Sequence, residues 1–162
     1  MLSADELYEI MINLDGHDLQ SLCSVSSDFN HLCQNPDFWK NKLRHDHLPL
    51  FNDPSSVIDY IKIKAAYDVQ LKYESQSYLM ITFTNQDLSL ILPSTFYNQI
   101  KKLDYDQVEL YLHYFKQSNM STMINYKALK NNKRIEVKMM KLTREEVLDV
   151  IFKIAYYYPD LI

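Results

Sequence analysis

Glycine is almost absent from this chain of 162 residues, which has one glycine, Gly16. Loops that hold phosphates or dinucleotides need several glycines, because glycine lets the backbone come close to the ligand. The sequence therefore excludes a P-loop and a dinucleotide-binding fingerprint. Apolar residues still make up 47% of the chain, which is enough to build the core of one medium domain or two small ones.

Long apolar runs are missing, and cysteine is scarce. No segment approaches the roughly 20 apolar residues of a membrane span, and Asp5, Glu6 and Glu9 interrupt the region where a signal peptide would be apolar. We therefore expect an intracellular protein, in the cytoplasm or nucleus, without membrane contact. In that reducing compartment we expect Cys23 and Cys33 to be small buried residues and not a disulfide.

Charge is distributed unevenly along the chain, although the net charge is −4. Residues 1–60 carry ten acidic and three basic side chains, whereas residues 120–146 carry seven basic and three acidic ones. This asymmetry indicates two surfaces with different partners.

The N-terminal segment has the periodicity of three short helices. Ser3 and Glu6 form the sequence pattern of a capping box, which predicts a helix over residues 3–13. Gly16 follows Asp15 in a turn signal, and we expect it to adopt a positive φ before a second helix that begins near residue 17. Pro36 fits the first turn of a further helix.

The apolar positions of this segment resemble the F-box family without a gap, up to the only tryptophan. The matching positions are Leu2, Asp5, Ile10, Leu14, Asp18, Leu19, Val25, Ser26, Phe29 and Trp39. The pattern usually has Pro where this chain has Ser3, and a basic pair where it has Ser27 and Asp28.

The resemblance implies a recruiter and not an enzyme, and it implies no cofactor. An F-box docks on a Skp-type adaptor, itself bound to the cullin scaffold of a ubiquitin ligase, so that a target held elsewhere on the chain is ubiquitinated. The chain also resembles the short F-box proteins of large DNA viruses, which would place it in a host cell. The expected adaptor-binding residues are Leu2, Leu7, Ile10, Leu14, Leu19, Leu22, Val25, Phe29 and Trp39.

A long helix over residues 54–74 follows a proline-bounded loop. Its apolar residues fall on two faces, which is typical of a helix packed between two bodies. We therefore expect three parts: a docking domain over residues 1–48, a connector over 49–74, and a target-recognition domain of unknown family over 75–162.

The last part has mixed periodicity, which predicts an α+β fold. We expect a hairpin of residues 78–83 and 88–92, helices over 94–102 and 105–116, and a second hairpin of 123–129 and 134–142. In the second hairpin, Ile135, Val137 and Met139 alternate with Glu136 and Lys138, so that one face is wet. A second capping box, at Thr143, begins a final, mostly apolar helix.

The basic residues of the second hairpin allow three interpretations. Lys130, Lys133, Arg134 and Lys138 could hold an acidic or phosphorylated segment of a target. They could instead contact nucleic acid, in which case the F-box-like helices serve for packing or assembly. They could also be a solvated face that protects a sheet edge.

Motifs for chemistry are missing. The histidines and cysteines of the N-terminal half lack the closely paired spacing of a zinc site, since Cys23 and Cys33 are ten positions apart. No serine, cysteine or histidine occurs in a recognisable nucleophile motif. We therefore expect no metal site and no catalytic residue.

Overall fold

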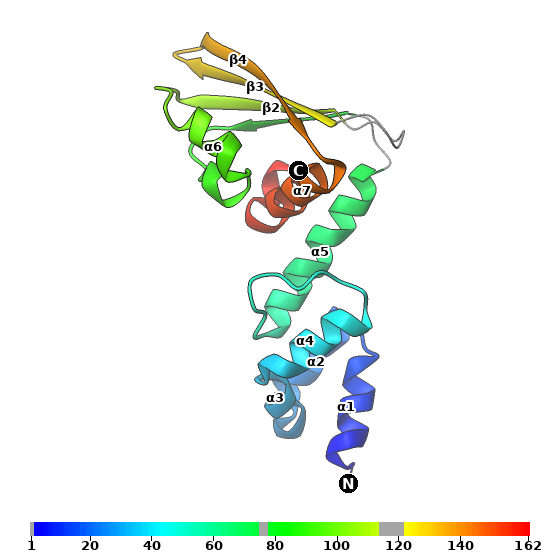
Figure 1. Cartoon of the computed structure of the whole chain (residues 1–162). Coiled ribbons are helices and arrows are strands. Elements are labelled where there is room, and N and C mark those ends of the chain that lie inside the picture. Colours follow the sequence, from blue (N-terminus) through cyan, green and yellow to red (C-terminus); the bar gives the residue numbers. More distant parts are fainter. Residues whose placement is uncertain (1, 75–77, 114–121) are drawn as a thin grey trace. The chain divides into compact units, whose positions relative to one another are not determined.

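The computed structural model describes residues 2–74, 78–113 and 122–162 of the chain (Figure 1). They form two compact units, Met1–Tyr67 and Asp68–Ile162. We call these the first unit and the second unit. The described part of the first unit is helical, and the second unit combines helices with a four-stranded antiparallel sheet. The predicted α+β class is confirmed.

The first unit contains short helices whose ends carry the expected caps. In the capping box of the first helix, the Glu6 backbone N–H donates to Ser3 Oγ at 3.2 Å, and the Ser3 N–H donates to Glu6 Oε2 at 2.7 Å. Pro36 stands in the first turn of the fourth helix, as predicted. The elements are α1 (Ala4–Ile12), α2 (Gly16–Val25), α3 (Ser27–Cys33), α4 (Pro36–His45) and the first part of α5 (Val57–Glu74).

Two local predictions in this region are wrong. The second predicted helix is broken at Ser26, whose backbone is extended (φ −130°, ψ 129°), so four helices and not three occupy residues 4–45. Gly16 is the first residue of α2 and has no positive φ. A Cβ at Gly16 would lie 3.0 Å from Ile61 Cγ1 and 3.3 Å from the Tyr60 ring. Glycine therefore permits the close approach of α5.

The two cysteines form a disulfide, which contradicts the sequence-based expectation of free thiols. The break at Ser26 ends α2 and starts α3 in a new direction. Cys23 and Cys33 thereby come to a Cα separation of 5.9 Å, although ten positions separate them in the sequence. Spacing along the chain could not reveal this pairing, because it depends on the break.

Trp39 lies at the centre of the first unit and is fully buried. Its indole N–H donates to the Cys33 carbonyl at 2.8 Å, which satisfies the one polar group of the ring. The rings of Phe38 and Tyr60 lie 4.9 Å and 5.9 Å from it, centroid to centroid. α3, α4 and α5 are thus joined through one side chain.

A buried cation completes this core. The Lys42 ammonium is covered, donates to the Ile12 carbonyl at 2.7 Å and pairs with Asp46 at 2.8 Å. The Tyr60 hydroxyl also donates to Asp46. Burial raises the pKa of Asp46, but the hydrogen bonds from Lys42, Tyr60 and His45 outweigh it and hold that pKa below its ordinary value.

The sheet of the second unit is a meander in the order β1-β2-β3-β4. Figure 1 shows α6 and α7 on the same side of it. The strands are β1 (Tyr78–Phe83), β2 (Gln107–His113), β3 (Thr122–Lys130) and β4 (Lys133–Leu142). The helical elements are η1 (Leu88–Leu90), α6 (Ser94–Ile100), α7 (Arg144–Tyr157) and η2 (Pro159–Leu161).

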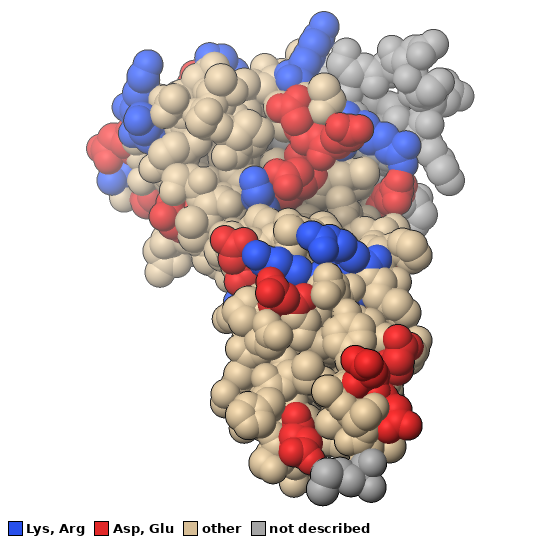
Figure 2. Space-filling model, turned by 60° about the horizontal axis from the view of Figure 1, so that its bottom comes forward, with Lys and Arg blue, Asp and Glu red and all other residues tan. Residues whose placement is uncertain are grey.

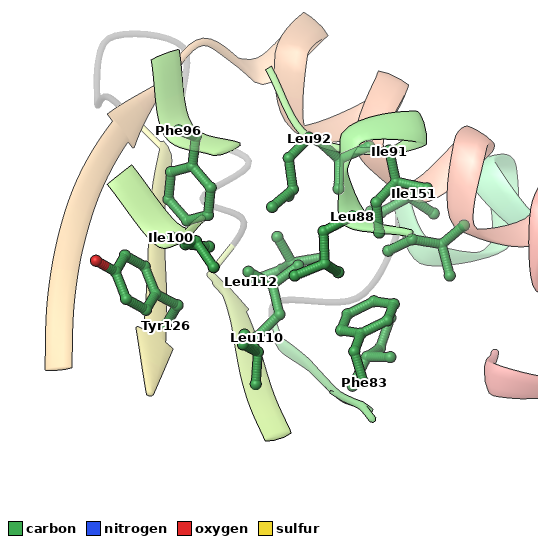
Figure 3. Packing of buried hydrophobic residues seen from close by; sticks show 14 of the residues in the cluster. Phe83, Leu88, Ile91, Leu92, Phe96, Ile100, Leu110, Leu112, Tyr126 and Ile151 are labelled. Carbon is green, nitrogen blue, oxygen red and sulfur yellow. The ribbon is translucent and has the colours of Figure 1, made fainter. Parts of the chain in front are cut away.

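Apolar side chains from the helices and the strands meet in one core (Figure 3). Phe96 of α6 contacts Tyr126 of β3 edge to face, with ring centroids 5.3 Å apart. Ile151 of α7 approaches the strands from the same side as Phe96. The core therefore covers one face of the sheet.

Some of the predictions for the second unit are confirmed and others are wrong. The second hairpin is confirmed, with Asn131 and Asn132 at its turn, and so are α6 and the capping box at Thr143. The first hairpin is wrong, because residues 88–90 form a 3-10 helix and β1 pairs with β2. The helix predicted over residues 105–116 is wrong as far as position 113, and residues 114–116 lie outside the described part.

The error at β2 has a clear cause. Val108, Leu110 and Leu112 are buried with the period of two that a strand requires. Tyr111 adds an apolar residue on the other face of the strand, and this completes an apparent helical spacing with Val108 and Leu112. The side chain of Tyr111 lies outside the core cluster.

The two predicted apolar faces of α5 are only partly buried. In the first unit, Tyr60, Ile63 and Ala66 are buried, and in the second unit Val69 and Tyr73 pack against the core. Glu74 at the end of α5 forms an ion pair with Arg144 of α7. Ile58 and Leu71, which were expected on the buried faces, are exposed.

Candidate docking surfaces

The nine residues expected to bind an adaptor fall into two groups in the first unit. Leu19 and Trp39 are fully buried, so they stabilise the domain and do not reach a partner in this conformation. The others are half-buried or exposed. Leu7, Leu14, Leu22 and Phe29 are half-buried, and Leu2, Ile10 and Val25 are exposed. Val25 is the extreme case, since 78% of its surface is accessible.

Exposed apolar residues on α1 and just before it border a shallow hollow with an acidic rim. The hollow has a volume of about 460 Å³, and Leu2, Asp5, Glu6, Glu9 and Ile10 line it. The hydrogen bonds with the backbone and side chain of Ser3 lower the pKa of Glu6, which therefore stays ionised at neutral pH. The site thus combines an apolar centre with negative charge.

The acidic residues of this hollow were not among the predicted site residues. Asp5 and Glu9 are four positions apart and flank the apolar stripe, which is the pattern of one helix face. That spacing could have identified them. In Figure 2, acidic side chains interrupt a mainly uncharged surface at the lower end of the view.

The four basic residues proposed as target contacts are not brought together. Lys130 pairs with Asp104 at 3.2 Å, and its neighbour Asn131 donates its backbone N–H to Asp106 at 2.9 Å, so these groups hold the turn. Lys133 begins β4 beside that turn. Lys138 lies opposite Tyr126 in the strand register, on the face that carries the core.

The apolar stripe of β4 faces solvent, which reverses the expected orientation of the second hairpin. Ile135, Val137 and Met139 are all exposed. The alternation itself is as predicted, but the helices cover the other face, where the Tyr126 hydroxyl donates to Glu136 at 3.1 Å. Burial and this hydrogen bond raise the pKa of Tyr126 to about 12. Alternation separates two faces without showing which one is covered.

One face of the sheet is not covered by the described helices, and we call it the open face. It carries two rows of side chains across the four strands. The first row consists of Met80, Tyr111, Asn125 and Met139. The second row consists of Thr82, Glu109, Lys127 and Val137.

The open face contains a hollow of about 370 Å³. Besides Tyr126, its lining residues are Tyr78, Tyr111, Asn125, Lys127, Arg134 and Val137. The Tyr111 hydroxyl donates to Glu109 Oε2 at 2.5 Å, which is the main reason why the pKa of Tyr111 rises to about 12. Glu109 also lies 3.8 Å from the Lys127 ammonium. Arg134 is thus the one predicted contact that lies at this hollow.

The described residues offer neither a metal centre nor a membrane span. No three histidine, cysteine or acidic side chains gather as ligands within these residues. None of the described helices has the length and hydropathy needed to cross a bilayer.

The first unit is thus a small domain of capped helices with exposed apolar residues. Residues 1–41 match the family model of the F-box domain. The chain therefore carries an F-box domain, which occupies about a quarter of its length. F-box domains bind Skp-type adaptors of ubiquitin ligases, and F-box proteins in general recruit substrates and are not enzymes. No curated protein and no solved structure matches the chain.

Proposed function

We propose that this protein is a substrate-recruiting subunit of a cullin ubiquitin ligase, acting inside the cell. The first unit docks on the Skp-type adaptor, and the second unit holds a target protein so that the ligase can ubiquitinate it. Proximity supplies the effect, so no residue of this chain takes part in bond making or breaking.

The observation that carries the proposal is the exposure of apolar residues in a domain with the F-box match. Leu2, Ile10 and Val25 belong to the segment of residues 1–41 and remain accessible on a folded helical unit. Apolar side chains of this size are stabilised when a partner covers them. The adaptor is the partner that an F-box indicates.

The alternative of nucleic-acid binding through the second hairpin has less support. Lys130 is held by Asp104, and Lys138 lies on the core side of β4. A continuous basic track, which single-stranded nucleic acid requires, is not formed by these residues.

Titration of the purified full chain with a purified Skp-type adaptor by calorimetry tests the proposal. Ile10→Asp puts a charge into the docking surface and should weaken binding by at least about thirtyfold, the effect expected for an interface hot spot. Ile135→Asp is the matched control, because Ile10 and Ile135 are exposed to 40% and 44%.

Wild-type protein that shows no adaptor binding would refute the proposed function. Equal loss of affinity in both variants would refute the assignment of the surface to α1. Circular dichroism of each variant confirms that the helices and the sheet are intact.

A further inference from the structure

We propose that the hollow on the open face is the target-binding site and that it takes a short acidic peptide segment carrying a large apolar side chain. This inference rests on the proposed function, because it identifies the part of the second unit that holds the target. The hollow lies within the second unit, so its chemistry can be tested separately from adaptor binding.

The apolar lining of the hollow is the reason for proposing a large apolar side chain in the bound peptide. Val137 lines the hollow and is 55% exposed, and Met139, on the same face of β4, is 56% exposed. The rings of Tyr78 in β1 and Tyr111 in β2 line the same hollow and lie 6.4 Å apart, centroid to centroid. Aromatic and thioether side chains are enriched where proteins bind one another.

The basic side chains of the hollow are the reason for proposing that the bound peptide is acidic. Lys127 and Arg134 both line the hollow and come from the paired strands β3 and β4. Arginine presents a planar fork of donors that matches a carboxylate. Glu109 is the acidic group nearest to Lys127, at 3.8 Å, a distance at which Lys127 can also contact an incoming anion.

A polar group in the hollow suits the backbone of a bound peptide. Among the described residues, Asn125 Oδ1 is covered and has no hydrogen-bond donor. A buried acceptor without a donor is costly, and a peptide backbone N–H would satisfy it.

The overall charge of the second unit points the same way. Residues 68–162 contain twelve basic and eleven acidic side chains. Proteins that bind nucleic acid without reading its sequence depend on strong positive potential, because most of the affinity comes from phosphates. A nearly balanced unit with local positive charge beside apolar residues fits a protein segment.

The test is a selection of short random peptides, displayed on phage, on the full-length protein. Selected sequences should place Asp or Glu beside Leu, Met, Phe, Tyr or Trp. A fluorescent copy of the strongest peptide should lose at least about tenfold in affinity with Arg134→Glu and with Val137→Asp, measured by anisotropy. A fluorescent oligouridine of similar length should not bind.

Two variants separate this inference from the proposed function. Ile10→Asp should lose the adaptor and keep the peptide, whereas Val137→Asp should lose the peptide and keep the adaptor. Selected peptides without acidic residues, or peptides that bind both open-face variants like the wild type, would overturn the inference. Oligouridine binding that depends on Arg134 would overturn it in favour of nucleic acid. Neither result would affect adaptor binding.

Discussion

The two units of this protein expose apolar side chains for different reasons. In the first unit, short helices leave Leu2, Ile10 and Val25 uncovered because the domain is too small to bury every apolar stripe. In the second unit, a complete core covers one face of a sheet, and Val137 and Met139 remain on the other face. The first pattern lies in a segment that matches the F-box family model, whereas no curated protein matches the chain and so none indicates a role for the second pattern. Exposure therefore identifies a candidate surface, and other information must identify its partner.

The variant with the largest expected effect tests whether the two units unfold independently. Trp39→Ala removes a fully buried ring that contacts α3, α4 and α5, and it should lower the stability of the first unit by about 3 to 5 kcal/mol. Hydrogen exchange followed by mass spectrometry should show lost protection in α1–α4 and unchanged protection in β1–β4.

The matched variant for this comparison is Tyr126→Ala, which removes a fully buried ring from the second unit. Its loss of protection should be confined to the sheet, α6 and α7. If either variant lowers protection equally in both units, the chain unfolds as one cooperative body and the comparison fails.

The next effect concerns the buried charge in the first unit. Asp46→Asn leaves the Lys42 ammonium covered without its counter-ion and should cost about 3 kcal/mol at neutral pH. Because the folded-state pKa of Asp46 lies below its ordinary value of 3.8, its carboxylate stabilises the fold above that pH. The contribution is lost as the pH falls through the lowered value.

Urea unfolding followed by Trp39 fluorescence measures this effect, since the only tryptophan reports on the first unit. The difference between wild type and Asp46→Asn should shrink in acid. Asp28→Asn, an exposed position in α3, is the control. A difference that is as large at acidic as at neutral pH would contradict the assigned charge pair.

The disulfide is a feature of the first unit alone, because both cysteines of the sequence lie there. It closes a loop with a sequence separation of ten residues, and its reduction should lower the stability of this unit by about 2 to 3 kcal/mol. Urea unfolding with and without dithiothreitol should show the shift in Trp39 fluorescence, and Cys23→Ser should reproduce it. Full alkylation of both thiols in the native protein without reductant would contradict the disulfide.

Predictions from the sequence were correct mainly for features that depend on residues close together in the chain. The capping boxes at Ser3 and Thr143, the start of α4 at Pro36 and the turn at Asn131 each depend on a few neighbouring residues. The F-box match depends on an ungapped pattern of the same local kind.

Predictions from the sequence were wrong for features that depend on contacts between distant parts of the chain. The pairing of β1 with β2 spans η1 and α6, and the disulfide depends on the break at Ser26. The open face could not be identified either, because alternation in β4 is the same whichever face the helices cover. Most residues of its hollow therefore remained unpredicted.

The smallest effect concerns the turn that joins β3 to β4, next to the proposed target site. Asn131 and Asn132 have φ values of 50° and 62°, the two positive angles that a two-residue hairpin turn of the primed type requires. Asn132→Gly relieves the left-handed strain and should raise the stability of the second unit by about 0.5 kcal/mol, whereas Asn132→Ala should lower it by about 1 kcal/mol. Thermal unfolding followed by circular dichroism of the sheet measures both shifts.

The sign of the Asn132→Gly effect follows from two opposing contributions. Glycine adds conformational freedom to the unfolded chain, which destabilises the fold, but it removes the strain of a side chain at positive φ. Asp106, which directly precedes β2, accepts the Asn131 N–H at 2.9 Å and holds the turn. The folded turn therefore keeps its geometry in the variant, and the loss of strain prevails. A lower stability for Asn132→Gly than for Asn132→Ala would show that this turn is not left-handed. Trp39 fluorescence should not change in either variant, because the strain is stored in the second unit alone.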